Sequence, residues 1–321
     1  MTQSPGQAPV AGETLIDVAL AMPARVFATV DGAQFDDASA VFAAAGFKAH
    51  SLFLGAADAE SEKAGPWLVD IDTQAALTRF IELLADKPAA VLWSCPTGEA
   101  TLYRHLRTLN EAIVPLLRAE AEARQRHADR RGEVITFTEA DYRSSRVLFR
   151  HWDPRVLAQV LPTLDESQFA RVLGPAALVV MPREDGGRPF QAHAPELAAI
   201  APQGPLRLNV AQMEAISETR VMQSRRRMAN YLREVAPNEC GKMDDRELSK
   251  FVVYSEGAAR GFGVESERAT TIWTYMMATS KTDISKDWRV QRLMAVRDPM
   301  TPDERVHHLF DARLRALKGG V

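Results

Sequence analysis

The feature of the sequence that most constrains the fold is a change of pattern near residue 205. Before this point, short apolar runs alternate with stretches whose apolar residues recur at helical spacing, whereas only the helical spacing continues after it. Alternating strands and helices are typical of an α/β layer. We therefore predict an α/β N-terminal lobe with a mixed or parallel sheet and flanking helices, followed by an all-α C-terminal lobe.

The α/β lobe should extend from residue 25 to residue 182. Its predicted strands are 25–30, 50–54, 67–71, 89–93, 147–152 and 176–181. Its predicted helices are 38–45, 72–84, 97–113, 153–161 and 165–173, and Thr97 is expected to cap the third of them. We expect a flexible tail and leading segment over residues 1–24. Residues 183–205, where prolines and glycines interrupt any periodicity, should form a linker.

The helical lobe should span residues 206–321. Its first helix is predicted over 210–235, with Pro237 ending it. Its last helix should begin at Thr301–Glu304, which reads as a capping box with proline at the first helical position. Helical spacing marks three more helices near 248–259, 269–277 and 288–294. The cluster Trp273–Met277 is expected to be helical core rather than a cofactor site.

Length and charge limit the class of protein. A chain of 321 residues favours two domains, and its net charge of -3 argues against a general nucleic-acid binder. Residues 1–204 carry a net charge of -7 and residues 205–321 a net charge of +4. The N-terminus resembles no signal peptide, and no apolar stretch approaches the ~20 residues of a membrane span. We therefore expect a cytoplasmic protein that contacts neither nucleic acid nor membrane.

Residues 115–145 interrupt the alternation of strands and helices with a dense run of charges. One interpretation is an exposed helical extension and loop. The other is a dedicated binding arm, although the mixed signs of its charges disfavour a nucleic-acid arm.

The search for catalytic chemistry yields one weak candidate. Motifs for phosphate binding, zinc proteases, serine hydrolases and calcium loops are not found, and the two cysteines are too far apart for a metal knuckle, so no cofactor or metal is predicted. Cys95 follows a predicted strand and precedes a helix, where a thiol can be activated. With His50, His105 or His151 as base, an α/β hydrolase or transferase remains the alternative to a non-enzymatic protein.

The stretch Arg150–Arg155 brings two cations, a histidine and a carboxylate together, and it allows a structural or a catalytic interpretation. Asp153 can cap a helix that has Pro154 at its first position. Arg150 lies in a predicted strand, so its charge should be largely buried and paired, with Asp31 the first candidate partner and Asp153 the second. The Arg150–Asp153 cluster therefore needs no reaction to explain it, although it stays the second candidate for the enzymatic alternative.

These residues carry a family resemblance. Phe149–Leu157 resembles a signature of the type VI secretion adaptor, or effector-chaperone, family. Other segments of the chain are also similar to segments of that family and occur in the order in which the family has them. They are Phe27–Ala33, Ser51–Gly55, Gly65–Val69, Leu102–Arg107, Leu161–Leu164 and Leu173–Pro175. The structural motif residues are Asp31, Gly32, Gly65, Pro66, Trp67, Arg150, Asp153, Pro154 and Arg155. Two departures are His151, where the family usually has an aromatic residue, and the long segment 115–145.

The resemblance implies a function without catalysis. It implies a cytoplasmic adaptor that binds a secreted effector protein and loads it onto the VgrG spike protein of the type VI secretion needle. The family has no established catalytic residues, so none is expected here, and the implied partners are the effector and the spike.

The helical lobe is the predicted partner surface. It holds eight of the eleven methionines, which suit adaptable interfaces, and the basic run Arg225, Arg226 and Arg227. The alternatives are that the methionines fill the core, that the arginines are merely solvated, and that partners bind the N-terminal lobe or the groove between the lobes.

Overall fold

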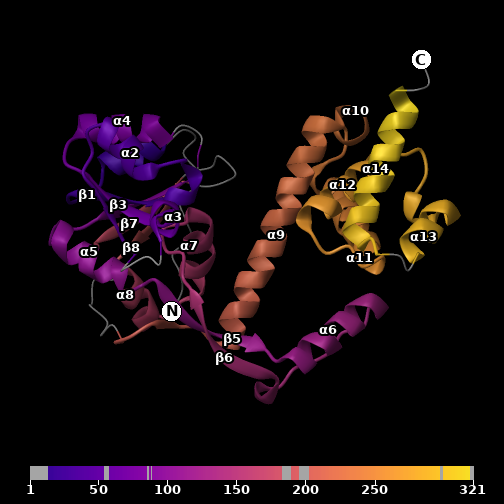
Figure 1. Ribbon diagram of the computed structural model, residues 1–321, viewed down its shortest axis with the longest axis horizontal. Helices are drawn as coiled ribbons and strands as arrows, with labels where there is room; N and C mark the ends of the chain where they lie inside the picture. Colours follow the sequence, from indigo (N-terminus) through magenta and orange to yellow (C-terminus); the bar gives the residue numbers. More distant parts are fainter. Residues whose placement is uncertain are drawn as a thin grey trace. The chain divides into compact units, whose positions relative to one another are not determined.

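The computed structural model describes residues 14–53, 58–84, 87, 89–182, 189–194, 202–296 and 299–318. The chain divides into two compact units (Figure 1). Unit 1 comprises residues 1–115 and 144–216, and unit 2 comprises residues 116–143 and 217–321. Unit 1 contains a sheet with flanking helices, and the C-terminal region is helical, which confirms the predicted fold class. Within the described ranges, no helix has both the length and the apolar character needed to cross a membrane.

Unit 1 is built around a six-stranded sheet with the strand order β2-β3-β1-β4-β7-β8. Its strands are β1 (Val26–Asp31), β2 (Ala49–Ser51), β3 (Pro66–Ile71), β4 (Ala90–Ser94), β7 (Leu178–Met181) and β8 (Phe190–His193). Each pair of neighbouring strands is antiparallel. The parallel alternative of our prediction therefore does not apply to this sheet.

The interleaving of strands explains this difference. Helix α2 (Ala38–Ala44) links β1 to β2, and helix α4 (Gln74–Leu84) links β3 to β4. In both cases the linked strands run in the same direction, as a helical crossover requires, but a third strand of opposite direction lies between them. Sequence alternation indicates the crossovers correctly and does not show which strands become neighbours.

Burial on both faces explains why these antiparallel strands read as continuous apolar runs. Along β1, the residues Phe27 to Val30 are all fully buried. Ala28 and Val30 belong to a core with helices α1 (Leu15–Leu20), α2 and α4. In Figure 1, α2 and α4 lie above the sheet, and α5 (Glu99–Arg107) and α8 (Glu166–Leu173) lie below it. Because helices cover both faces of the sheet, polar and apolar residues do not alternate along its strands. The sequence pattern of these antiparallel strands therefore resembles that of a parallel sheet.

A second, small sheet has the order β6-β5-β9 and corrects the predicted helix 97–113. Helix α5 begins after Gly98, whose φ is +85° and which provides no side-chain cap, so Thr97 is not the N-cap. The helix ends at Arg107, and β5 (Glu111–Leu117) follows it. The other strands are β6 (Tyr142–Leu148) and β9 (Leu206–Arg207), and β9 pairs with β5 in parallel.

Three short helices complete unit 1. They are α3 (Ala59–Ala64), where no helix was predicted, and α7 (Pro154–Val160) and α8, which were predicted over 153–161 and 165–173. One-turn 3₁₀ segments lie at Gly32–Gln34 and Leu161–Thr163.

Unit 2 is a helical bundle. Its helices are α6 (Ala119–Arg131), α9 (Val210–Val235, which begins in unit 1), α10 (Pro237–Cys240), α11 (Asp245–Gly261), α12 (Glu267–Ala278), α13 (Trp288–Ala295) and α14 (Pro302–Lys318). Short 3₁₀ segments lie at Glu139–Asp141 and Ile284–Lys286. Thr301 and Glu304 form the predicted hydrogen bonds at the start of α14.

The methionines of the helical region are mostly structural. Met228, Met276, Met277 and Met294 are buried, whereas Met222 is 61% exposed. Trp273, Met276 and Met277 are buried in the core of unit 2, which confirms the core interpretation of the stretch Trp273–Met277. Only part of the methionine set is therefore free to form a partner surface.

Helix α6 shows that the charged segment 115–145 is more than a solvated extension. Ala121 and Ala128 are buried, and a separation of seven residues places them on one helical face. Helix α6 packs against α11 within unit 2. The small alanine face allows this contact, while the charged face stays exposed.

The predicted domain boundaries differ from the division seen in the structure. Unit 1 continues to residue 216, and residues 116–143 belong to unit 2. The described part of the predicted linker 183–205 includes β8, whose backbone extends the six-stranded sheet. Of the predicted tail 1–24, residues 1–13 lie outside the described residues, and Thr14 caps α1.

Candidate functional site

The motif residues converge at one end of the six-stranded sheet. Gly32, after β1, donates its backbone N–H to the carbonyl oxygen of Gly65, before β3, at 3.1 Å. A Cβ atom at Gly32 would lie only 2.2 Å from the carbonyl oxygen of Lys63 and 2.4 Å from that of Gly65. Trp67 also donates its indole N–H to the Lys63 carbonyl at 3.3 Å. Glycine at position 32 is therefore required for the close approach of two backbone segments.

Arg150 joins this cluster through two carboxylates. Its Nη2 atom lies 2.8 Å from Asp31 and 3.3 Å from Asp153, so the predicted pairing is confirmed for both candidates. The prediction that Arg150 is largely buried is wrong, because its side chain is 42% exposed, whereas that of Asp31 is 6% exposed. The strand ends at Leu148, and Arg150 opens a turn in which its carbonyl accepts from the Asp153 N–H.

Asp153 also has the predicted capping role. Its side chain accepts a hydrogen bond of 2.9 Å from the backbone N–H of Arg155, and the buried Pro154 occupies the first turn of α7. Arg155 itself is exposed at the surface of that turn. The two carboxylates and Arg150 therefore fix the entry to α7 relative to the end of β1, which is a structural arrangement.

A buried histidine lies beneath this turn. His151 is fully buried among Trp93, Phe149 and Trp152, with ring centroids 5.1 to 6.3 Å away. Asn110 donates its side-chain N–H to Leu52, so its oxygen faces His151 and accepts from the ring Nε2–H at 3.2 Å. Among the residues that the structure describes, none forms a hydrogen bond with the Nδ1 atom of His151. Burial lowers the pKa of His151 from 6.5 to about 3, with the nearby His105 adding to the shift, so this histidine is neutral.

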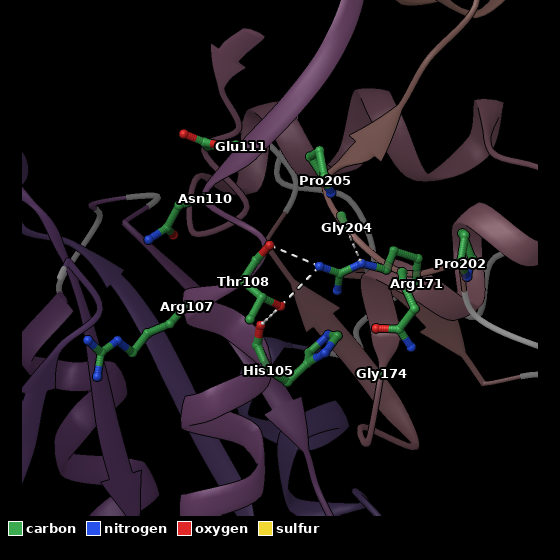
Figure 2. A pocket seen from close by; sticks show the side chains of 11 residues that line it. His105, Arg107, Thr108, Asn110, Glu111, Arg171, Gly174, Pro202, Gly204 and Pro205 are labelled. Atoms are coloured by element: carbon green, nitrogen blue, oxygen red, sulfur yellow. Dashed lines mark hydrogen bonds between the residues drawn. The ribbon is translucent and has the colours of Figure 1, made fainter.

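A hollow of about 490 Å³ lies beside this cluster and is lined by the end of α5, by α8 and by residues 202–205. Figure 2 shows Arg171 directed at Thr108 and Gly204, while Arg107 extends away from them. Arg171 is 7% exposed and donates to the carbonyls of Gly204 and Thr108 at 2.8 and 2.9 Å and to the Thr108 hydroxyl at 3.0 Å. The negative end of the α5 dipole lies at Thr108 and offsets the guanidinium charge. Arg171 therefore ties α8 to the end of α5.

His105 and Gly174 form another wall of the hollow. Burial is the main cause that lowers the pKa of His105, and its ring Nε2–H donates to the Val172 carbonyl at 3.0 Å. Gly174 has φ +54°, and a Cβ atom there would lie 2.2 Å from the His105 ring. This glycine is needed for its conformation and for the close contact. The hollow is thus a polar recess whose charged groups hold its own walls together.

The two candidates for catalysis are Cys95 and the Arg150–Asp153 cluster, and the contacts of the cluster are described above. Cys95 is fully buried, and its sulfur lies 3.4 Å from the Thr97 hydroxyl and 3.6 Å from the Pro175 carbonyl. Of the three histidines proposed as its base, His50 pairs with Glu99 at 3.1 Å, while His105 and His151 have the partners described above. The described residues contain no group of acidic, histidine and cysteine side chains suited to a metal ion.

The predicted partner-binding arginines are on α9 in unit 2. Arg225 pairs with Glu256 on α11 at 2.6 Å, and Arg227 pairs with Glu267 on α12 at 2.8 Å. Arg226 is exposed and also has an interaction partner. Arg227, Glu256 and Glu267 line a hollow of about 540 Å³ of mixed charge. The run therefore clamps three helices together, and at least two of its charges are neutralised within the unit.

Sequence reasoning missed the residues that link these parts. Asn110 was assigned to a helix, although it connects His151 to Leu52. Arg171 was not singled out, although a charge directly before Val172 and Leu173, in an otherwise apolar helix end, was the available signal.

Comparison with known families covers one part of this cluster, the residues from Asp31 to Trp67, and ends before Arg150 and Asp153. Residues 26–132 match the model of a family described as a domain of unknown function, DUF4123. The match covers about a third of the chain. No curated protein and no solved structure shows significant similarity to the chain.

Proposed function

We propose that this protein is an adaptor of a type VI secretion system, which binds a secreted effector and the VgrG spike protein and acts without catalysis. The observation that carries the proposal is the ordered set of family-like motifs, of which Gly32 with Gly65 and Arg150 with Asp31 and Asp153 lie in contact at one end of the unit 1 sheet. The family model over residues 26–132 is compatible with this role.

The chemistry of the cluster supports a scaffold. Gly32 and Gly65 allow backbone segments to approach, Arg150 neutralises Asp31 and Asp153, and His151 is neutral and enclosed. Each of these groups has a structural role in the fold. The thiol of Cys95 is enclosed as well, and activated thiols are partly accessible to their substrates.

Co-expression tests the proposal. The protein, an effector and the VgrG spike from the same bacterium are produced together, and the tagged protein is purified over a sizing column. The proposal predicts a complex that contains all three proteins, and no complex when the effector comes from an unrelated bacterium. Failure of both pairwise interactions, with all three proteins folded, would contradict the proposal.

A further inference from the structure

The charged segment 115–145 contains a strand-like stretch that belongs to neither sheet. We call it the 133–137 segment, and its sequence is Glu-Val-Ile-Thr-Phe. Valine, isoleucine, threonine and phenylalanine are residues that favour β-strands. The segment lies between α6 and β6 and runs without a turn or bend. Val134 is 97% exposed, the largest exposure of any large apolar side chain among the described residues.

Contacts with α6 anchor both ends of the 133–137 segment. Gly132, with φ +66°, turns the chain at the end of the helix, and the Glu133 N–H donates to the Ala128 carbonyl at 2.9 Å. At the other end, the Arg124 guanidinium lies 5.7 Å from the centroid of the Phe137 ring. Because Ala128 and Arg124 are both on α6, the segment runs back along this helix and is held in place.

The backbone of the segment is open for strand pairing. From Val134 to Phe137, its N–H and C=O groups form no hydrogen bond with any residue that the structure describes. The side chains alternate as in a strand with one covered face, since Ile135 and Phe137 are half-buried while Val134 and Thr136 are exposed. The segment is therefore one half of a β-ladder, and a strand from another chain can complete it.

The sequence around the segment is complementary to itself in an antiparallel arrangement. When Ile135 faces Ile135 of a second copy, Val134 of each copy faces Thr136 of the other. The charges at the two ends then match, because the exposed Arg131 of each copy faces the exposed Glu139 of the other. A parallel arrangement in register would instead place like charges against each other. The backbone accepts any extended peptide, whereas the matched charges favour the same segment.

We propose that the 133–137 segment binds the same segment of a second copy of this chain, as an antiparallel ladder with Ile135 on the twofold axis. Backbone hydrogen bonds supply the attraction, and the two Arg131–Glu139 pairs set the register. Arg131 keeps its own Glu133, 2.8 Å away, and lies between two carboxylates in the dimer. A contact with twofold symmetry closes at a dimer, which is weak because one pair of strands buries little area. Self-association of this kind is independent of the proposed function.

Sedimentation velocity of the full chain over about a hundredfold range of concentration measures the dimer. Arg131→Glu and Glu139→Arg, made singly, place like charges opposite each other at both ends of the ladder. Each should weaken dimerisation about tenfold, because the change acts twice in a symmetric contact. The double variant restores opposite charges and should dimerise within about threefold of the original protein. Arg246→Glu, which reverses another exposed arginine of unit 2, is the control and should leave the dimer unchanged.

Cysteine cross-linking tests the register of the ladder. Chains with Val134→Cys, mixed with chains that carry Thr136→Cys, should form a disulfide-linked dimer under mild oxidation, because these two positions face each other. Each variant alone should cross-link far less, since a residue then faces its own counterpart only diagonally. The two natural cysteines, Cys95 and Cys240, are buried and do not compete.

Three results would overturn the inference. A monomer at every concentration would overturn it and leave the proposed function standing. A dimer that is unaffected by both charge reversals, or that lacks the mixed cross-link, would place the contact on another surface. Protection of the 133–137 segment from hydrogen exchange only after addition of the effector would assign the segment to that partner and overturn the second copy as its occupant.

Discussion

The enclosed histidine predicts a specific dependence of stability on pH. The pKa of His151 is lowered from 6.5 to about 3 in the folded protein, mainly by burial. Above pH 6.5 the ring is neutral in both the folded and the unfolded chain and contributes nothing. As the pH falls from 6.5 towards 3, the unfolded chain takes up a proton that the folded chain refuses, so the free energy of unfolding decreases.

The size of the effect follows from the two pKa values. One pKa unit corresponds to about 1.4 kcal/mol, so at about pH 5 the folded protein should have lost roughly 2 kcal/mol through His151 alone. Replacing His151 with phenylalanine removes this titration. The variant loses the hydrogen bond to Asn110, which lowers its free energy of unfolding. This loss should be about the same at every pH, so it does not change the pH dependence.

Urea unfolding followed by tryptophan fluorescence measures this difference, since Trp93 and Trp152 contact the ring. Between about pH 7.5 and pH 5, the original protein should lose roughly 2 kcal/mol more than His151→Phe does. The exposed His193, changed to phenylalanine, is the control and should follow the original protein. His151→Gln, which keeps a hydrogen-bonding group, serves as a second non-titrating variant. Equal pH dependence in the original protein and both His151 variants would refute the reasoning.

Three further predictions test the same unit. Arg150→Ala should lower the free energy of unfolding by about 1–2 kcal/mol, because the buried Asp31 loses a partner. This loss is smaller than the loss expected for a fully buried ion pair, since Arg150 is partly exposed. Urea titration measures it, and a loss below ~0.5 kcal/mol would contradict the prediction. Gly174→Ala should cost about 2 kcal/mol or more, since the new methyl group meets the His105 ring in a strained conformation; an unchanged melting temperature would contradict it. Cys95 should react with iodoacetamide only after denaturation, as mass spectrometry can show, and rapid labelling of the folded protein below pH 8 would favour the enzymatic alternative.

The elements of the fold were predictable wherever local chemistry defines them. Asp153 before Pro154, and Thr301 before Pro302, carry their capping roles in the sequence, so α7 and α14 begin where expected. Strand β1 was predictable within about one residue because its apolar run ends at the turn signal Asp31-Gly32. The pairing of strands was not predictable, since burial on both faces hides the alternation that distinguishes antiparallel from parallel sheets.

The candidate site was predictable only in its closest contacts. The pairing of Arg150 with Asp31 follows from the free-energy cost of an unpaired charge. The exposure of Arg150 depends on where β6 ends, and the sequence pattern alone does not fix the end of a strand. The run Arg225 to Arg227 appeared free in the sequence because its carboxylate partners lie on helices 31 and 40 residues further along the chain. The exposure of Trp288 could not be predicted either, because it follows from the burial of Val290 and Met294 on the other side of α13.

The most direct test of the proposed function is whether the spike retains the effector only in the presence of this protein. Tagged VgrG is purified from cells that produce the effector, with or without the protein, and the amount of effector bound per spike is measured by quantitative mass spectrometry. We predict that the effector is recovered with the spike when the protein is present and is reduced to background when it is omitted. Equal recovery of the effector in both preparations would contradict the role of an adaptor.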